Sequence, residues 1–383
     1  MISFDHNFEA VAVMADIPGA DAKGAMLPAA RRQWLLEHLA GRGVLRITHI
    51  ARIMGVTPVT VRRDVSDLAA EGLVERVHGG VRLVSGPAAA AGRWSGATPA
   101  IGMVVPSLDY YWPEVIRGAQ DAAQENRARL VLRGASYRVD EVRHQVEWMI
   151  GNGAVDALLV APPTRGAEAE GLVAWLTALP VPVVLVERAA VTGPYRRHVE
   201  SVRTDHAAGA ELAVRHLHGE GHRRVGLVVS TTSPTSGHVR EGWHRATSDL
   251  ALPPAPELLV SAYYEPGWGV DVDRVLDLCA EQGVTALVVH SDREAVSLVQ
   301  RAEERGLHVP GDLAVVAYDD EVARFAHPPL TAVRPPKYAV GGTAVELALD
   351  RLAHGADRPV RRVVLSSELR ERGSTGSPAR ALR

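Results

Sequence analysis

Residues 57–83 read TPVTVRRDVSDLAAEGLVERVHGGVRL, a stretch that predicts one helix followed by a short hairpin. Thr57 is placed to cap this helix, and Pro58 stands at its first position, where a missing N–H removes no helical hydrogen bond. Apolar residues recur with helical spacing and predict one buried face: Val61, Val65 and Leu68.

The opposite face of the same helix carries side chains that a core does not need. At about 100° per residue, Val59, Arg62, Arg63 and Ser66 point away from the apolar stripe. The early residues of such a helix can enter the major groove of DNA, where arginine bonds guanine O6 and N7 together. Each such contact discriminates between bases by about 1–3 kcal/mol. The pattern therefore predicts a helix that reads DNA.

A hairpin is predicted directly after this helix. Two short apolar strands flank Gly79-Gly80, which has the turn chemistry of a tight hairpin. Arg76, His78 and Arg82 place cationic or hydrogen-bonding groups near the tip. We expect the hairpin to act as a wing that contacts phosphate or the minor groove.

Two more helices are predicted upstream, over residues 29–40 and from Thr48 to Gly55. Thr48 suits the N-cap of the second helix, and Gly55 suits the tight turn before the next one. Their expected buried positions are Leu35, Leu36, Leu39, Ile50, Ile53 and Met54.

These residues together resemble the DeoR-type winged helix-turn-helix of bacterial transcription regulators. The resemblance rests on Val61-Arg62-Arg63-Asp64, on the spacing to Glu71-Gly72-Leu73, and on Arg76-Val77-His78-Gly79-Gly80. It implies that double-stranded operator DNA is the partner and that Asp64 orients a neighbouring arginine. The DNA-contacting residues that it implies, wing included, are Thr57, Val59, Thr60, Arg62, Arg63, Arg76 and His78.

Beyond residue 99, short apolar runs alternate with helical stretches. Strands that alternate with helices indicate a parallel sheet, and the units are too many for one mononucleotide-sized sheet. We therefore expect two α/β lobes. The predicted strands are Ile101–Val105, Leu130–Leu132, Ala157–Val160, Val183–Val186, Val225–Val229, Ala286–Val289 and Leu313–Ala317. The predicted helices are Glu114–Glu125, Glu141–Ile150, His206–His218, Asp271–Glu281 and Arg293–Arg305.

Two of the predicted strands lead into segments that suit a ligand, because open α/β sheets bind ligands at the carboxyl ends of their strands. One loop, residues 109–112, combines a carboxylate with three aromatic rings, a set that suits a sugar ring. The aromatic rings could instead pack as a plug between the lobes. The second segment ends at Asp292, which could bind ligand or serve as a helix N-cap.

The body of the chain resembles the LacI-type effector-binding domain, which is similar to periplasmic sugar-binding proteins. The resemblance runs over about residues 100–369 and rests on Gly221-His222-Arg223-Arg224-Val225, on His290-Ser291-Asp292 and on residues 306–320 and 328–333. It implies that the following residues line a cleft between two lobes: Asp109, Tyr110, Tyr111, Trp112, Glu187, Arg188, Arg240, Tyr264, Asp292 and Lys337.

The chain departs from the LacI type at two points. The family places a ligand-contacting arginine three residues before a Gly-aromatic pair, whereas Arg240 stands two residues before Gly242-Trp243. The linker also lacks the short hinge helix that LacI-type repressors insert into the minor groove. We therefore expect ligand to act by closing the lobes and changing the spacing of two wings in a dimer.

Composition excludes several classes of protein. The 383 residues suggest two or three domains, and no apolar run approaches the roughly 18 residues that span a bilayer. The lone Cys279 cannot form an internal disulfide and fits a small core residue. Net charge is −3 over residues 1–26 and +4 over residues 27–85, which leaves −4 for the rest. A basic module on an acidic body is consistent with one segment that meets a polyanion.

We expect a disordered tail over residues 1–26, a winged helix-turn-helix over 27–84, a linker over 85–99, a two-lobed domain over 100–370 and a disordered tail over 371–383. Met26 is a candidate translation start. The acidic N-terminus has the wrong charge for a secretory or transit peptide, so a cytoplasmic protein is expected.

The function expected from these features is a homodimeric repressor of carbohydrate uptake or catabolism genes, released by a small sugar-like effector. No catalytic motif, cofactor site or metal site is found, so we do not expect an enzyme. The alternatives left open are an activator, a regulator that needs a corepressor or a non-sugar ligand, and less favoured, a transport-type sugar-binding protein or an enzyme.

Overall fold

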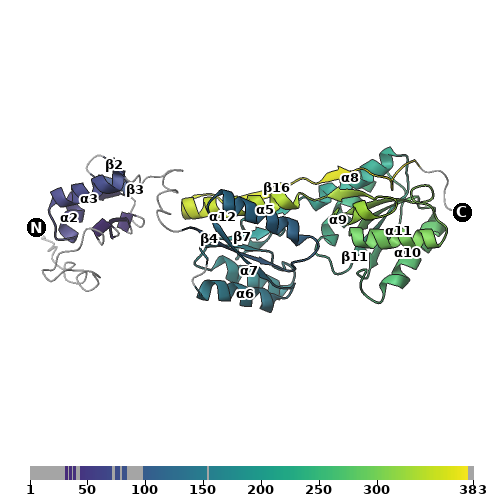
Figure 1. The fold of residues 1–383 in the computed structure, drawn as a ribbon, viewed down its shortest axis with the longest axis horizontal. Coiled ribbons are helices and arrows are strands. Elements are labelled where there is room, and N and C mark those ends of the chain that lie inside the picture. The colour runs from purple at the N-terminus through teal and green to yellow at the C-terminus, as the bar shows by residue number, and fades with distance from the viewer. Residues whose placement is uncertain are drawn as a thin grey trace, which may run out of the picture. The chain divides into compact units, whose positions relative to one another are not determined.

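The computed structural model describes residues 31–32, 34–36, 38–39, 44–70, 74–77, 80–83, 98–152 and 155–377. The chain divides into two units, one made of Met1–Thr98 with Asp350–Arg358 and the other of Pro99–Leu349 with Pro359–Arg383 (Figure 1). The expected tail over 1–26 and most of the expected linker over 85–99 lie outside the described residues.

The first unit contains the predicted helix-turn-helix. Helices α2 (Ile47–Ile53) and α3 (Pro58–Ala70) follow a helical segment whose described residues are 31–32, 34–36 and 38–39. Strands β1 (Val44–Arg46), β2 (Val74–Val77) and β3 (Gly80–Leu83) form an antiparallel sheet in the order β1-β3-β2. Most of the predicted buried positions pack together in its core: Leu35, Leu39, Ile50, Met54, Val61, Val65 and Leu68.

Two local predictions in this unit are wrong. The helix predicted to begin at Thr48 begins at Ile47, with Arg46 as its N-cap and no side-chain cap. The cause is strand pairing, because Val44–Arg46 is held extended against β3 up to the residue before the helix. Ile53 is exposed rather than buried. Gly55 ends the turn as expected, with a φ of 64° that suits glycine.

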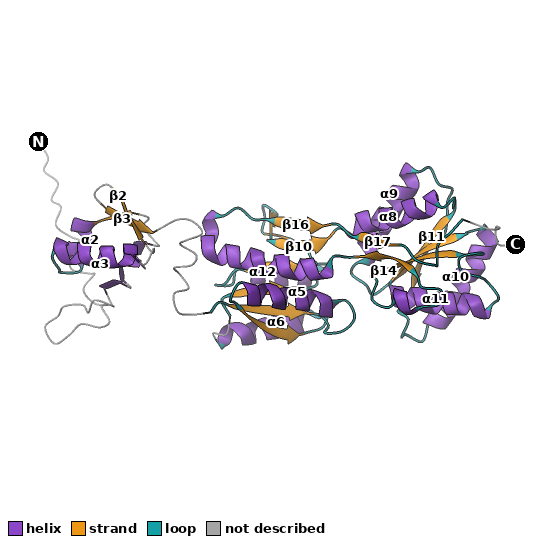
Figure 2. Cartoon of the chain, turned by 45° about the horizontal axis from the view of Figure 1, so that its top comes forward, coloured by secondary structure: helices purple, strands orange, loops and turns teal. Residues whose placement is uncertain are grey.

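The second unit holds two lobes, each built on a six-stranded sheet (Figure 2). In lobe 1 all strands are parallel, in the order β16-β10-β7-β6-β4-β5. Helices α5 and α12 lie on one face of this sheet and α6 and α7 on the other (Figure 1). The elements are β4 (Ala100–Val105), α5 (Trp112–Glu125), β5 (Arg129–Gly134), α6 (Val139–Gly151), β6 (Ala157–Val160), α7 (Ala167–Thr177), β7 (Val183–Val186), β10 (Ser201–Thr204), α12 (Lys337–His354) and β16 (Arg362–Leu365), with the small hairpin β8 (Val191–Thr192) and β9 (Arg197–His198). The last turn of α12, from Asp350, and the 3-10 turn η2 (Gly355–Asp357) are counted with the first unit.

Lobe 2 repeats this plan. Its sheet has the order β12-β11-β13-β14-β15-β17, and only β17 pairs antiparallel. One core packs α8 and α9 on the sheet, and a second core, which contains the buried Cys279, packs α10 and α11. The elements are α8 (His206–Gly219), β11 (Val225–Ser230), α9 (Ser236–Asp249), β12 (Glu257–Val260), α10 (Trp268–Gln282), β13 (Ala286–His290), α11 (Asp292–Glu304), β14 (Ala314–Tyr318), the 3-10 turn η1 (Ala323–Phe325), β15 (Thr331–Arg334) and β17 (Glu368–Arg370).

The chain crosses between the lobes three times: from β10 to α8, from β15 to α12, and from β16 to β17. Tyr318 lies at these crossings. Its hydroxyl donates to the carbonyl of His206 at 3.0 Å, and the space beside it exists because residue 209 is a glycine whose Cβ would lie 2.4 Å from that hydroxyl. Because Tyr318 is fully buried at the end of β14, its hydrogen bond holds the start of α8 against the sheet of lobe 2.

The predicted parallel α/β architecture with two lobes is confirmed, and all seven predicted strands are present. Helices α7, α9 and α12 were not predicted. In α12 the pair Gly341-Gly342 argues against a helix, yet a Cβ on Gly341 would lie 1.9 Å from the carbonyl oxygen of Val115. The glycine is needed because α12 approaches α5 closely.

The predicted end of the domain at residue 370 is wrong for residues 371–377. Ser374 is fully buried, donates from its hydroxyl to the Val315 carbonyl at 2.6 Å and accepts from the Thr331 amide at 2.8 Å. This segment therefore extends lobe 2. Among the described helices, none combines the length and apolar character that crossing a membrane requires.

Candidate functional site

Helix α3 presents the side chains predicted to meet DNA. Thr57 caps it: its hydroxyl oxygen accepts from the Thr60 amide at 3.2 Å and lies 2.9 Å from the Thr60 hydroxyl. Val59 is 68% exposed. Arg62 and Arg63 are exposed, and neither side chain makes a hydrogen bond or ion pair with another described residue. Two unpaired guanidinium groups and an apolar side chain thus share one surface of the helix.

Asp64 has the role expected of it. Its carboxylate is buried and accepts from Arg31 Nε at 2.8 Å and Nη2 at 3.1 Å, a bidentate pair that ties α3 to the preceding helical segment. For the wing, β2 and β3 form the predicted hairpin, with Val77 opposite Gly80. His78 lies outside the described residues, and only the backbone of Arg76 is described.

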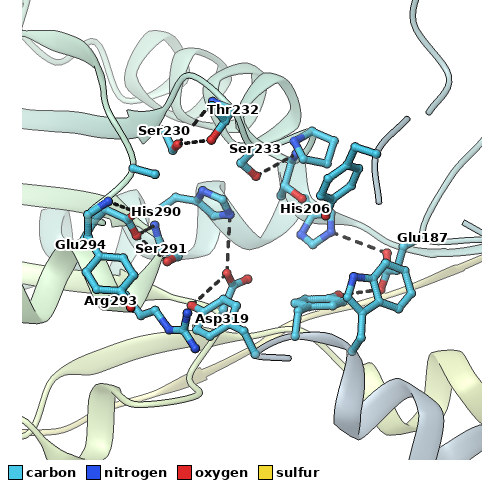
Figure 3. A pocket seen from close by; sticks show the side chains of 18 of the residues that line it. Glu187, His206, Ser230, Thr232, Ser233, His290, Ser291, Arg293, Glu294 and Asp319 are labelled. Carbon is cyan, nitrogen blue, oxygen red and sulfur yellow. Dashed lines mark hydrogen bonds and ion pairs between the residues drawn. The ribbon is translucent and has the colours of Figure 1, made fainter. Parts of the chain in front are cut away.

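The second unit contains a cavity of about 210 Å³ between the lobes, at the carboxyl ends of the parallel strands (Figure 3). Lobe 1 contributes aromatic rings and the Glu187-Arg188 pair, and lobe 2 contributes hydroxyls, histidines and charged groups. The lining residues are Tyr110, Tyr111, Trp112, Tyr137, Glu187, Arg188, His206, Ser230, Thr232, Ser233, Pro234, Thr235, Ala262, Tyr263, Tyr264, His290, Ser291, Arg293, Glu294 and Asp319.

Glu187 is the polar centre of the lobe 1 wall. Its carboxylate accepts from the Tyr111 hydroxyl at 2.6 Å and from the Thr204 hydroxyl and amide at 2.7 and 2.9 Å, and His206 Nε2 lies 3.6 Å away (Figure 3). Burial alone would raise the pKa of this carboxyl, but the hydrogen bond and charge of His206 and the other donors lower it to about 2. Glu187 is therefore ionised and already satisfied by protein donors.

The lobe 2 wall has a different polar set. Glu294 accepts from the Ser291 amide and from the Tyr263 amide, both at 3.1 Å, in the capping box of α11. His290 Nε2 lies 3.6 Å from Asp319 Oδ2, and both side chains are buried. His290 Nδ1, also buried, has no hydrogen-bond partner among the described residues. A buried ring nitrogen without a partner is costly unless a bound molecule or water satisfies it.

Tyr110 and Tyr111 are neighbours in the chain but bind to opposite lobes. The Tyr110 hydroxyl donates to Asp292 of lobe 2 and lies 3.3 Å from Asp319, whereas Tyr111 donates to Glu187 of lobe 1. Burial raises the pKa of both tyrosines, so both hydroxyls keep their protons. Tyr110 is therefore a direct link between the lobes.

Backbone strain gathers at the same place. Tyr110, Glu187 and Asp319 line the cavity with φ values of 59°, 55° and 89°, a region that non-glycine residues rarely adopt. Each such residue costs on the order of 1–3 kcal/mol, and strain of this kind concentrates at ligand sites.

Two arginines line the cavity without an ion pair. The Arg293 guanidinium lies over the rings of Tyr110 and Tyr263, at 4.3 and 5.6 Å from their centroids. The Arg188 guanidinium lies 5.9 Å from the Tyr137 centroid and donates to the Glu187 carbonyl at 2.7 Å. Within the described part of the chain, neither pairs with a carboxylate.

The structure places six of the ten predicted cleft residues in the lining: Tyr110, Tyr111, Trp112, Glu187, Arg188 and Tyr264. The cleft positions predicted for Asp109, Arg240, Asp292 and Lys337 are wrong, because none of these side chains lines the cavity. Arg240 pairs with Glu257 on the surface of lobe 2. Lys337 is buried and binds the Asp319 carbonyl and Glu321.

Asp292 is fully buried behind the cavity wall. Besides the Tyr110 hydroxyl, its carboxylate accepts from the Val322 and Ala323 amides at 2.6 and 2.9 Å. The N-cap role considered from sequence does not apply, since Ser291 is the N-cap of α11. Asp292 instead fixes the Tyr110 loop and the η1 turn to the start of α11.

The sequence analysis did not select His206, His290, Arg293 or the hydroxyl-bearing loop from Ser230 to Thr235. Arg293 directly follows Asp292 at the start of a helix, so the strand-end rule could have included it. The loop from Ser230 to Thr235 also follows a predicted strand, so the same rule could have included it. His206 follows β10, a strand that was not predicted. Among the described residues, no cluster of His, Cys, Asp or Glu is suited to hold a metal ion.

Comparison with known proteins agrees with both parts of the structure. Residues 31–86 match the DeoR-like helix-turn-helix domain, and residues 214–375 match the periplasmic binding protein-like domain. The PurR transcriptional repressor of Pasteurella multocida is 26% identical over 313 residues, which cover 80% of this chain and 91% of that protein. The arabinose metabolism transcriptional repressor of Geobacillus stearothermophilus is 27% identical over 328 residues, covering 82% and 86%.

Solved structures show the same fold. A LacI family transcriptional regulator from Enterococcus faecium, solved with bound ribose, superposes with a TM-score of 0.59 at 21% identity. The superposition covers 72% of this chain and 98% of that one. The chain therefore joins a DeoR-like helix-turn-helix domain to a periplasmic binding protein-like domain, and over most of its length it is similar to transcriptional repressors and to LacI family regulators.

Proposed function

We propose that the protein represses genes of carbohydrate uptake or catabolism, with α3 reading operator DNA and a small sugar-like effector binding between the lobes. The observation that carries this proposal is that one chain combines a polar cavity at the strand ends with a helix whose two exposed arginines, Arg62 and Arg63, make no side-chain hydrogen bond or ion pair with a described residue. One site meets a polyanion and the other a small molecule.

The cavity supports a small ligand with both polar and apolar faces. Its volume of about 210 Å³ lies below the range of about 300–1,000 Å³ that holds drug-sized molecules. Six aromatic rings stand beside hydroxyls, histidines and charged groups, a mixture suited to a sugar ring: Tyr110, Tyr111, Trp112, Tyr137, Tyr263 and Tyr264. The relatives named for arabinose metabolism and solved with ribose favour a ligand of this class.

A binding role is favoured over catalysis. Both oxygens of Glu187 and of Glu294 already accept protein hydrogen bonds, so neither is free to act as a general base. The wall offers positioning groups instead.

We propose that ligand acts on DNA affinity through the lobes. Tyr110 joins a loop of lobe 1 to Asp292 of lobe 2, so a ligand that inserts beside it changes the relative stability of two lobe arrangements. In a homodimer, that change alters the spacing of two wings, and operator half-sites one helical turn or a multiple apart would follow. Such a regulator works where bacterial DNA is, in the cytoplasm.

DNA reading is tested by selecting binding sites from a random duplex library with the natural protein and with Arg63→Ala. We expect the variant to lose about 1–3 kcal/mol of discrimination at one base pair of each half-site, while preferences elsewhere stay. An equal loss of affinity for every sequence would instead assign Arg63 to a phosphate. No sequence preference in the natural protein would refute the DNA-reading role.

Ligand binding is tested by thermal unfolding in the presence of monosaccharides, oligosaccharides, nucleosides and sugar phosphates. A ligand at a hundredfold excess over its Kd stabilises by about 2.7 kcal/mol, so a true effector stands out. Arg63→Ala should keep the shift, because α3 belongs to the other unit. A shift only with nucleosides would contradict the sugar-like effector.

Repression and activation require the same structural features. An activator or a corepressor-dependent regulator would also carry α3 and the cavity, so a reporter gene in cells with and without the protein is needed. Loss of the protein should raise expression of the target.

A further inference from the structure

Some of the groups that line the cavity already form hydrogen bonds within the protein, and others do not. The groups without protein partners indicate which chemical groups the effector must carry. The inference rests on the proposed function and names the chemical class of the effector. Carboxylate oxygens are acceptors only, and guanidinium N–H groups are donors only. A ligand must complement whichever of them the protein leaves unused.

The carboxylates near the cavity are largely used by the protein. Glu187 accepts from Tyr111 and Thr204, and Glu294 accepts from Ser291 and Tyr263. Asp319, which is buried, lies beside His290 and the Tyr110 hydroxyl. The wall therefore offers few free acceptors to a ligand.

The donor groups of the arginines, by contrast, are largely unused by the described residues. Arg293 is half-buried and presents five N–H donors, yet it makes no hydrogen bond or ion pair with any described residue. It only stacks on Tyr110 and Tyr263, which holds the guanidinium plane in place. A guanidinium held in place over aromatic rings is preorganised for a bidentate acceptor such as a carboxylate or phosphate.

The surroundings of Arg293 favour the same charge. It is the second residue of α11, a helix of 13 residues, and the first turn of a helix stabilises a nearby anion. Arg188, on the lobe 1 wall, adds a second guanidinium without a carboxylate partner. Among the described residues, neither guanidinium therefore forms an ion pair with a lining carboxylate, whereas Glu187 is bound by its protein donors.

We propose that the effector is an acidic sugar, a sugar phosphate or a sugar acid, whose anionic group binds Arg293. His290 Nδ1, buried and without a partner, bonds a hydroxyl of the same molecule. A neutral sugar would leave the half-buried Arg293 guanidinium without the bidentate acceptor that its geometry suits. Phosphate and carboxylate share the required chemistry, and matched probes separate them.

The test measures binding by calorimetry with the full chain and matched neutral and acidic probes: glucose, glucose 6-phosphate and glucuronate for one sugar, and ribose and ribose 5-phosphate for the other. Inorganic phosphate serves as the anion alone. We expect at least one acidic probe to bind about tenfold or more tightly than its neutral parent. Comparison of the phosphate with the sugar acid then identifies the anionic group.

Two variants locate the anion. Arg293→Gln keeps the stem and removes the charge, and we expect it to weaken the preferred acidic probe by about 10- to 100-fold, the effect of a lost charge-assisted hydrogen bond. Its affinity for the neutral parent should change less than threefold. Arg324→Gln removes an arginine that also stacks on a ring in lobe 2 but does not line the cavity, and it should leave all affinities unchanged.

The outcomes separate this inference from the proposed function. Neutral sugars that bind more tightly than every acidic probe, with Arg293→Gln equal to the natural protein, would overturn the acidic effector and leave a sugar-responsive regulator. Equal weakening of neutral and acidic probes by Arg293→Gln would also overturn it. Binding of no sugar, neutral or acidic, by a protein that still binds operator would overturn both.

Discussion

The two walls of the cavity differ in how far their polar side chains are hydrogen-bonded within the protein. On lobe 1, Glu187 is ionised and bound by Tyr111 and Thr204, so its polar groups satisfy one another. On lobe 2, Arg293 and His290 Nδ1 have no hydrogen-bond partner among the described residues. The hydrogen bonds of Glu187 stabilise the first wall, whereas Arg293 and His290 on the second wall are available to a ligand.

This difference separates stability from recognition. Substitutions in the satisfied wall leave buried donors or acceptors without partners and should unfold the lobes. Substitutions in the unsatisfied wall should change ligand affinity with little effect on stability. Tyr110 belongs to both groups because it joins the walls.

The largest effect is expected for Glu187→Ala. The change leaves the Thr204 amide and the Tyr111 hydroxyl buried without the carboxylate acceptor and removes the carboxylate beside His206, so we expect a loss of about 3–5 kcal/mol in the free energy of unfolding. Urea unfolding of the full chain measures it. The control Glu241→Ala removes an exposed ion-pairing glutamate and should cost less than about 1 kcal/mol. Equal losses would contradict a satisfied wall.

Low pH should also destabilise the folded protein through Glu187. The pKa of Glu187 is lowered from 4.5 to about 2, so its ionised form stabilises the folded state above pH 4.5. That contribution, roughly 3 kcal/mol, is lost as pH falls from 4.5 towards 2. Unfolding free energies at pH 6 and pH 3 measure it. Glu187→Gln should have a shallower decline over this window, and an unchanged decline would assign acid sensitivity to other carboxyls.

A smaller effect is expected for Tyr110→Phe. It removes the hydrogen bond between the lobes and leaves one Asp292 oxygen without its donor, and we expect a loss of about 1.5–3 kcal/mol. Thermal unfolding provides the measurement. Tyr195→Phe, at an 83% exposed tyrosine in the β8-β9 hairpin, should be neutral. A Tyr110→Phe protein as stable as the natural one would remove Tyr110 from the satisfied network.

The smallest effect is expected for Arg188→Gln. Its guanidinium donates one hydrogen bond to the Glu187 carbonyl and is half-buried, so we expect a stability loss of about 1 kcal/mol or less. The same unfolding measurement applies. A loss as large as that of Glu187→Ala would show that Arg188 is as important to stability as the hydrogen bonds around Glu187.

The DNA-reading helix could be predicted almost residue by residue because its determinants are local. Thr57 and Pro58 mark its start, and the spacing of Val61, Val65 and Leu68 fixes which side faces the core. The start of α2 was misplaced because β3, far along the chain, holds Val44–Arg46 extended. Local sequence patterns do not show a pairing between strands so far apart in the chain.

The cavity could be predicted only in part. The strand-end rule found Tyr110 and Tyr111, since a strand and its next residues are adjacent in sequence, and the LacI-type resemblance added Glu187. The rule placed Asp292 in the cavity, whereas amides of the η1 turn and the Tyr110 hydroxyl enclose it. Which carboxylates are already satisfied, and which arginines are not, depends on contacts between distant segments.

The most direct test of the account is the affinity of the full chain for its selected operator duplex, measured by fluorescence anisotropy with and without the probe that gives the largest thermal shift. We predict that a saturating probe weakens operator binding by about tenfold or more, within the usual range of coupling between sites. Operator affinity that is unchanged or increased by the bound probe would contradict an effector-released repressor.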